Sequence, residues 1–151
     1  MEHFEARLEL PCAAEVAFDF LARPENIKKI SPPGMGLFFV EAPERLSLGA
    51  KMHFKVQAFG VAREAVHEIT QFNEPLSFTE KQVKGPLGHW VHDHIFEADG
   101  EGSVVVIDRI EFKPPGGVVG LMITADRILD NLEDGFDHRH DQLEKLLGFK
   151  S

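Results

Sequence analysis

The sequence predicts an α+β protein, in which a curved antiparallel sheet of six to seven strands wraps around a long C-terminal helix and two short helices follow the first strand. Three observations support this fold class. Hydrophobic and polar residues alternate over most of the chain before residue 114, the joints between these segments are short, and the hydrophobic spacing becomes helical after residue 117. With 151 residues, we expect one domain, 1–151, with one hydrophobic core.

The first predicted elements are a strand and two short helices. Residues 3–10 place a hydrophobic side chain at every second position, which is typical of a half-buried strand, and Pro11 ends it. Residues 12–21 have the hydrophobic pattern of a short helix, whose end is forced by Pro24. Residues 25–30 are expected to add one or two helical turns.

Six further strands are expected in the middle of the chain. The joints between them contain Gly, Pro, Asn or Asp and are too short for crossover helices, so neighbouring strands are expected to pair as antiparallel hairpins. The predicted ranges are 36–41, 50–59, 61–72, 76–84, 88–97 and 103–113.

The last predicted element is a long amphipathic helix after the turn-forming residues 114–117. It is the only element long enough to cover the hydrophobic face of the sheet. Because a straight helix does not follow a curved sheet along its whole length, we expect a cavity between the two. Arg139 and His140 flank the hydrophobic stripe of the helix, so either side chain could reach into that cavity. The stripe comprises Ala125, Leu129, Leu132, Phe136, Leu143 and Leu147.

Composition narrows the class of protein. The formal net charge of −9 and the lack of a Lys/Arg cluster argue against nucleic-acid binding. Cys12 is the only cysteine, so no internal disulfide can form, which favours a reducing compartment. Residues 1–20 contain charges and no apolar block, so we expect a cytoplasmic protein without stable membrane association. Because tyrosine is absent, catalysis would depend on His, carboxylate or Arg side chains.

Residues 78–97, FTEKQVKGPLGHWVHDHIFE, form the most distinctive segment. Trp90, His92, His94 and Phe96 alternate along the predicted strand, so their side chains share one face. Paired histidines at this spacing supply two ligands in some zinc and iron sites. An aromatic face with imidazoles at its centre also suits the wall of a pocket.

A metal site would need a third ligand. Asp108 is the best local candidate, because a hairpin closed through residues 98–102 would pair it with His92. No further Cys or His spacing supports a metal. We therefore favour the pocket wall and expect neither a metal nor a cofactor.

An inward-facing Asp108 beside His92 has two interpretations. It would orient the imidazole as a general base requires, or it would form a structural hydrogen bond. We favour the structural hydrogen bond. Arg109, the next residue of the strand, would point to the opposite side.

Glu80 and Gln82 share one strand face with Phe78. If this face is inward, a buried Glu80 needs a partner or a raised pKa, which is how a catalytic acid or base is usually formed. We favour the alternative, in which the carboxylate lies on a solvated outer face or forms a salt bridge with Arg63 or Arg109.

The order of the predicted elements resembles the helix-grip fold of the START, polyketide-cyclase and birch-pollen-allergen superfamily, often called SRPBCC, over essentially the whole chain. The resemblance implies a cavity for a small hydrophobic or amphipathic molecule and no defined reaction. Phe112 and Leu87 depart from the pattern, since tyrosine or another ring is commoner there, which weakens any transfer of a catalytic hydroxyl. The residues that look like a bacterial ligand-binding branch are Phe78, Glu80, Gln82, Gly85, Pro86, Trp90, His92, His94, Phe96, Glu97, Asp108 to Phe112, Pro114, Gly116, Leu132, Phe136 and Arg139.

Three functions follow as hypotheses. We favour binding, for transport or sensing, of a small hydrophobic or amphipathic molecule by a monomer or homodimer. The second is a cofactor-free enzyme of the cyclase or dehydrase type, in which His92 or His94 removes a proton and Asp108 orients it. The third is a protein-interaction module such as a chaperone activator, which predicts a large exposed apolar patch outside the cavity. The residues expected to line the cavity are Phe78, Glu80, Gln82, Trp90, His92, His94, Phe96, Asp108, Ile110, Phe112, Leu129, Leu132, Phe136, Arg139 and His140.

Overall fold

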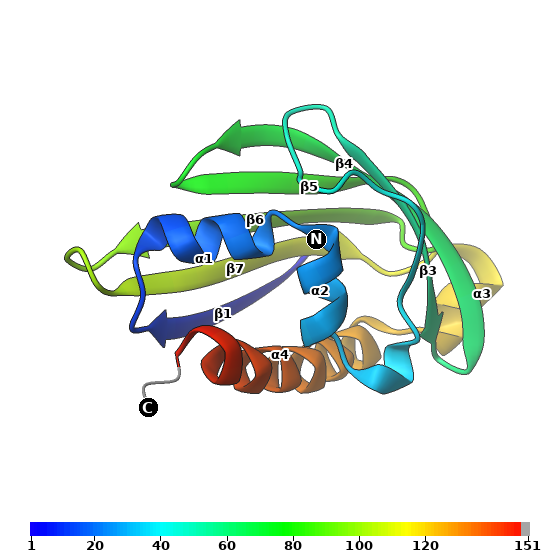
Figure 1. Cartoon of the computed structure of the whole chain (residues 1–151). Helices are drawn as coiled ribbons and strands as arrows, with labels where there is room; N and C mark the ends of the chain where they lie inside the picture. The colour runs from blue at the N-terminus through cyan, green and yellow to red at the C-terminus, as the bar shows by residue number, and fades with distance from the viewer. Residues whose placement is uncertain (149–151) are drawn as a thin grey trace.

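The computed structural model describes residues 1–148 and contains a seven-stranded antiparallel sheet with helices on its concave side (Figure 1). The strands are β1 (Glu2–Leu10), β2 (Phe38–Glu41), β3 (Lys51–Ala58), β4 (Val61–Asn73), β5 (Ser77–Lys84), β6 (His89–Ala98) and β7 (Val104–Lys113). The helices are α1 (Ala14–Leu21), α2 (Pro24–Ile30), the 3-10 helix η1 (Pro33–Met35), α3 (Gly117–Met122) and α4 (Ala125–Leu147).

The predicted α+β fold class is confirmed. The strand order is β1-β7-β6-β5-β4-β3-β2, so strands β2 to β7 follow one another as hairpins and β1 adds to the far edge beside β7. The pairing of β1 with β7 runs from Glu2 opposite Phe112 to Leu10 opposite Val104. This arrangement places β5, β6 and β7, which carry most of the predicted site residues, in the middle of the sheet.

Several predicted boundaries are shifted at Pro and Gly. Pro24 begins α2 as well as limiting α1, because its fixed φ suits the first helical turn and its missing N–H has no partner to lose there. The strand predicted from residue 36 begins at Phe38, since η1 precedes it and Gly36 adopts a left-handed φ of 57°. Helix α3 was not predicted. It follows Gly116 within the expected turn.

The long C-terminal helix is present where its hydrophobic stripe predicts it. The side-chain oxygen of Thr124 accepts a hydrogen bond from the Arg127 N–H at 3.3 Å and caps the start of α4. The Gly148 N–H donates to the Glu144 carbonyl and closes its end. Helix α4 packs beside β1 and α2. None of the helices within residues 1–148 is long and apolar enough to cross a membrane.

The concave side of the sheet has two parts. In the part under α1, which we call the α1 half, the Phe18 ring packs edge-on against Phe72, Phe78 and Phe96 at centroid distances of 5.3, 5.5 and 5.1 Å. The part that faces α4, the α4 half, has a smaller buried cluster of Ile110, Phe112, Ile123, Ile128 and Phe136.

Candidate functional site

A cavity of about 300 Å³ lies between the sheet and the helices. Most of its wall is apolar, with contributions from Leu21 on α1, Phe54 on β3, Trp90 on β6 and Phe136 on α4. The polar residues on the wall include Arg63, His67, Glu80, His92, His94 and Arg139.

The residues predicted to line the cavity divide into two groups. Five of them lie behind the wall or beside it: Phe96 packs under Phe18, Asp108 lies behind the histidines, and Phe112, Leu129 and His140 do not contribute to the lining. The structure places on the wall Phe78, Glu80, Gln82, Trp90, His92, His94, Ile110, Leu132, Phe136 and Arg139.

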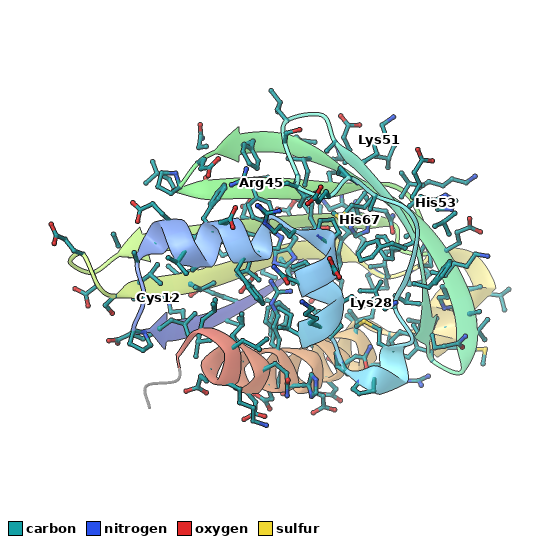
Figure 2. All side chains as sticks on the ribbon, in the orientation of Figure 1. Cys12, Lys28, Arg45, Lys51, His53 and His67 are labelled. Carbon is teal, nitrogen blue, oxygen red and sulfur yellow. The ribbon has the colours of Figure 1, made fainter. Side chains whose placement is uncertain are left out.

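His67, which was not predicted as a site residue, is buried on the inner face of β4 (Figure 2). Its neighbours at the same face, Ala65 and Ile69, are also buried. The alternation of these residues along the strand was the available signal, but a lone histidine between apolar residues is more often a satisfied core residue than part of a site.

Strand register brings two carboxylates to the histidines of β6. Glu80 on β5 lies opposite His92, and Asp108 on β7 lies opposite His94. The prediction that Asp108 pairs directly with His92 is therefore wrong. The β6–β7 hairpin closes with Ala98 opposite Val104, so the partner of each β6 residue lies two positions further along β7 than predicted. Because side chains alternate with a period of two, Asp108 still faces inward and lies diagonally across from His92.

Five of these side chains form what we call the imidazole–carboxylate cluster: His67, Glu80, His92, His94 and Asp108. The His92 Nε2 lies 2.7 Å from Asp108 Oδ1, and the His94 Nε2 lies 2.7 Å from Glu80 Oε1. The His67 Nδ1 lies 2.8 Å from Glu80 Oε2. Each histidine can therefore donate a hydrogen bond to a buried carboxylate, which is how a low-polarity interior accommodates such charges.

The favoured outward or salt-bridged placement of Glu80 is wrong, since its partners are His67 and His94. The neighbouring Gln82 explains how this orientation is fixed. Its side-chain amide donates to the Leu87 carbonyl at 2.8 Å and accepts from the Leu87 N–H at 3.3 Å. These bonds tie the β5–β6 turn to β5. They hold β5 in the register in which Glu80 faces the cavity.

The two central imidazoles are stacked. The rings of His92 and His94 have centroids 3.7 Å apart and planes 19° apart, and Phe78 stacks on the other side of His94 at 4.2 Å. Phe136 meets the His92 ring at 6.0 Å and 63°. The stack fixes the direction of each ring nitrogen, so that Glu80 lies on one side of the pair and Asp108 on the other.

The charges in the cluster are strongly coupled. Burial by itself raises the pKa of Glu80, but hydrogen bonds from His67 and His94 outweigh it and hold that pKa well below its usual value. Burial likewise opposes ionisation of Asp108, yet the Arg139 charge and the His92 hydrogen bond hold its pKa below the ordinary range. The cluster therefore keeps both carboxylates ionised.

His94 is neutral at neutral pH. Burial, together with the neighbouring charge of His92, lowers the pKa of His94 from 6.5 to about 4. With its Nε2–H directed at Glu80, the Nδ1 carries the lone pair and has no hydrogen-bond partner among residues 1–148. His94 is thus held as a fixed tautomer on the cavity wall.

His92 differs from His94 in the nitrogen that it leaves available. Its Nε2 is engaged by Asp108, while its Nδ1 lies 3.7 Å from Glu80 Oε1, which is too long for a hydrogen bond. His92 also lines the cavity. A buried imidazole that is oriented by a carboxylate on one nitrogen and unbonded on the other is able to exchange a proton with a neighbouring group.

Two residues on the wall have hydrogen-bond donors without partners in the described part of the chain. These are Nε1 of Trp90 and Nε and Nη2 of Arg139. Arg139 Nη2 lies 3.7 Å from Asp108 Oδ1, and the guanidinium lies 5.2 Å from the centre of the Phe136 ring. This side of the cavity therefore has an excess of donors over acceptors.

One ligand atom from each of Glu80, His92 and His94 lies within 4.8 Å of the others, which is close enough to consider a metal ion. A metal binds an imidazole nitrogen in the plane of its ring. Because the two rings are stacked, their planes do not meet near the nitrogens. Coordination would require one ring to leave the stack and its hydrogen bond, so the geometry favours a hydrogen-bonded cluster.

No family model and no curated protein matches the chain. Solved structures do match. TTHA0849 from Thermus thermophilus is similar with a TM-score of 0.74 and 14% identity, over 96% of this chain and 99% of that chain. Ginseng major latex-like protein 151 from Panax ginseng gives 0.65 and 18%, over 93% and 96%. Ara h 8.0201 gives 0.65 and 14%, over 96% of each chain.

At these identities the similarity shows the fold. The chain shares with these structures a curved antiparallel sheet wrapped around a long C-terminal helix, which is the fold class that the sequence predicted.

Proposed function

We propose that the protein binds a small hydrophobic or amphipathic molecule in the cavity between the sheet and α4. The observation that carries the proposal is the combination of a mostly apolar wall with unpartnered donors on Trp90 and Arg139. In small-molecule sites an apolar wall takes up the body of the ligand and a few polar groups fix its orientation. A molecule with an apolar body and a hydrogen-bond acceptor at one end fits both features.

The imidazole–carboxylate cluster supports a role beyond folding. A buried set of ionic groups is weak evidence for stability, because well-packed apolar residues of similar volume are often as stable or more so. In the α1 half, phenylalanine rings fill the corresponding space next to the same strands. A cluster retained beside a cavity is consistent with polar recognition of a ligand.

The test uses Trp90, which is the only tryptophan and lies on the wall. Binding of an amphipathic probe such as anilinonaphthalene sulfonate should change its fluorescence. Ala65→Phe, on the inner face of β4, should fill part of the cavity and abolish the change. Ala62→Phe, on the exposed side of the same strand, is the matched control and should bind like the wild type. Equal binding by Ala65→Phe would reject the cavity as the site.

A second candidate function is proton transfer, and the His92–Asp108 hydrogen bond favours it. In this reaction His92 Nδ1 takes a proton from a carbon next to a carbonyl group. The enolate oxygen that results accepts a hydrogen bond from Arg139, and in a β,γ-unsaturated carbonyl compound return of the proton to the γ-carbon completes an isomerisation. Asp108 holds the imidazole in the required tautomer and stabilises its charged form.

This reaction is tested by solvent exchange. Wild-type protein in D2O should replace the α-hydrogen of a bound carbonyl compound by deuterium, as seen by proton NMR. His92→Gln should abolish the exchange, whereas Arg109→Gln, which alters the exposed neighbour of Asp108, should not change it. Exchange that persists in His92→Gln would show that His92 is not the base. It would not affect the proposal of ligand binding.

A further inference from the structure

Three of the most exposed hydrophobic side chains lie on the short helix α3. Val118, Leu121 and Met122 are 76%, 81% and 68% exposed, and no residue of α3 is buried. Residues 114–124, which include this helix, carry no charged side chain. Figure 1 shows α3 at the end of the sheet opposite the β6–β7 hairpin, behind β3 and β4 in this view. Contiguous exposed apolar side chains of this kind mark an interaction surface.

The orientation of α3 is fixed by close backbone contacts. A Cβ atom at Gly120 would lie 2.2 Å from the Pro115 carbonyl oxygen, so only glycine allows the helix to fold back against the preceding segment. At the other end, Arg127 Nη1 donates to the Met122 carbonyl at 2.7 Å. The inner side of α3 is therefore occupied by the chain itself, and its apolar side chains are directed outward.

The turn between β3 and β4 belongs to the same end of the molecule. Its two central residues, Phe59 and Gly60, have φ values of 53° and 78°, as a two-residue hairpin turn requires. The Arg127 guanidinium lies 5.1 Å from the centre of the Phe59 ring and so joins this turn to the end of α3. We call Val61, which is also exposed, with Val118, Leu121 and Met122, the apolar tip.

The apolar tip is continuous with the cavity wall. Phe59 lines the cavity, and it is two residues before Val61. Pro115 and Ile123 also line it, and they flank α3 on both sides. A surface that covers the tip therefore lies against the segments that form this end of the cavity.

Charge is distributed unequally between the two ends of the sheet. The exposed charges that adjoin α3 in sequence are Lys113, Arg127 and one acidic residue, Asp126. At the opposite end, the loop between β6 and β7 carries two charged side chains, Asp99 and Glu101, which are both acidic and exposed, and the exposed Glu97 lies near the end of β6. Next to α3, basic side chains thus outnumber acidic ones, which favours contact with lipid phosphates.

From these observations we infer that the apolar tip docks reversibly on a lipid bilayer. The protruding helix has six residues, and a specific protein interface needs about 800 Å² from each partner, which so small a convex element does not supply. Shallow insertion into a bilayer needs only a few apolar side chains with cationic neighbours. The inference goes beyond ligand binding, because docking does not require an occupied cavity.

The experiment is co-sedimentation of the full chain with phosphatidylcholine vesicles. The wild type should sediment with the vesicles. The double variant Val118→Glu/Leu121→Glu should lower the bound fraction at least about tenfold, because two carboxylates would have to enter the apolar layer. Leu76→Glu is the matched control, since Leu76 is 64% exposed in the β4–β5 turn at the opposite end of the sheet, and it should sediment like the wild type.

Three outcomes would overturn the inference. The wild type could stay in the supernatant, or Leu76→Glu could lower binding as much as the double variant. Size-exclusion chromatography without vesicles could also show that the wild type is a dimer and the double variant a monomer. That result would assign α3 to contact with a second copy. Unfolding midpoints of all variants should equal that of the wild type, because the substituted side chains are exposed.

Discussion

The two halves of the concave face of the sheet are packed differently against the helices that cover them. In the α1 half, Phe18 is fully buried and its ring meets three other phenylalanine rings at close range. In the α4 half, the neighbouring positions of the same strands carry histidines and carboxylates, and a cavity of about 300 Å³ lies beside them. One half is closed and apolar, whereas the other is open and contains the buried polar groups.

This difference indicates that stability and recognition are separated along the sheet. Tight aromatic packing in the α1 half supplies burial of apolar area without polar groups to satisfy. The α4 half leaves space unfilled and keeps buried charges, both of which reduce the stability available from that region. Substitutions in the two halves should therefore differ in what they change.

The largest effect is expected for Phe18→Ala. Removing a fully buried ring from a closed aromatic cluster should lower the free energy of unfolding by about 3 to 5 kcal/mol. Phe54→Ala, on the cavity wall, should lower it less, because one side of that ring already faces empty space. Urea denaturation of both variants measures the difference. Equal losses would mean that the two halves are packed alike.

Breaking the imidazole–carboxylate cluster should have the next largest effect. Asp108→Ala removes the acceptor of His92 and leaves the Arg139 charge near no carboxylate, so unfolding free energy should fall by about 3 kcal/mol. Arg109→Ala is the control on the opposite face of the same strand. Its ion pair with Glu5 is exposed to solvent and should contribute little to the free energy of unfolding. Similar losses for both would contradict a buried cluster.

Stability should also depend on pH through His94. Its folded-state pKa of about 4 lies below the ordinary 6.5, so the unfolded chain binds the extra proton between these values and stability falls as pH is lowered through that range. The loss is on the order of 3 kcal/mol. Urea denaturation from neutral pH to about pH 4 should show it in the wild type and not in His94→Gln. The same slope in both would exclude His94.

At lower pH the carboxylates add a second loss. Their folded-state pKa values are lowered, so the stability that Glu80 and Asp108 contribute is present above their ordinary pKa values and disappears as pH falls below them. Glu80→Gln and Asp108→Asn should each reduce this acid-side loss. The two pH ranges thus separate the histidine from the carboxylates in one set of measurements.

The smallest effect is expected for Arg139→Met, which keeps the length of the side chain and removes its donors. Affinity for an acceptor-bearing probe, measured by Trp90 fluorescence, should fall about tenfold, because a hydrogen bond to a charged group contributes roughly 1.5 to 3 kcal/mol. Affinity for a purely apolar probe of similar size should not change. A uniform loss for both probes would assign Arg139 to the shape of the cavity.

The sequence predicts the strands, the long helix and the inward faces well, because each depends on hydrophobic periods that extend over many residues. It does not predict strand register, which depends on the exact closure of each turn. The β6–β7 hairpin illustrates this difference. A shift of two residues kept Asp108 on the inner face and moved its direct partner from His92 to His94.

Other features were missed for local reasons. His67 stands alone between apolar residues of β4, and only its contact with Glu80 from the adjacent strand relates it to the cluster. Helix α3 is too short for a hydrophobic period and follows Pro and Gly residues that predict a turn. The position of its exposed side chains beside the cavity wall depends on the tertiary structure, which the local sequence does not predict.

Native mass spectrometry of the freshly purified protein tests the central claim most directly. If the α4 half is a binding cavity, the wild type and Ala62→Phe should retain an added mass that Ala65→Phe loses, or should acquire one from a supplied amphipathic molecule that Ala65→Phe does not bind. The account is contradicted if all three proteins show the same spectrum, with or without that molecule.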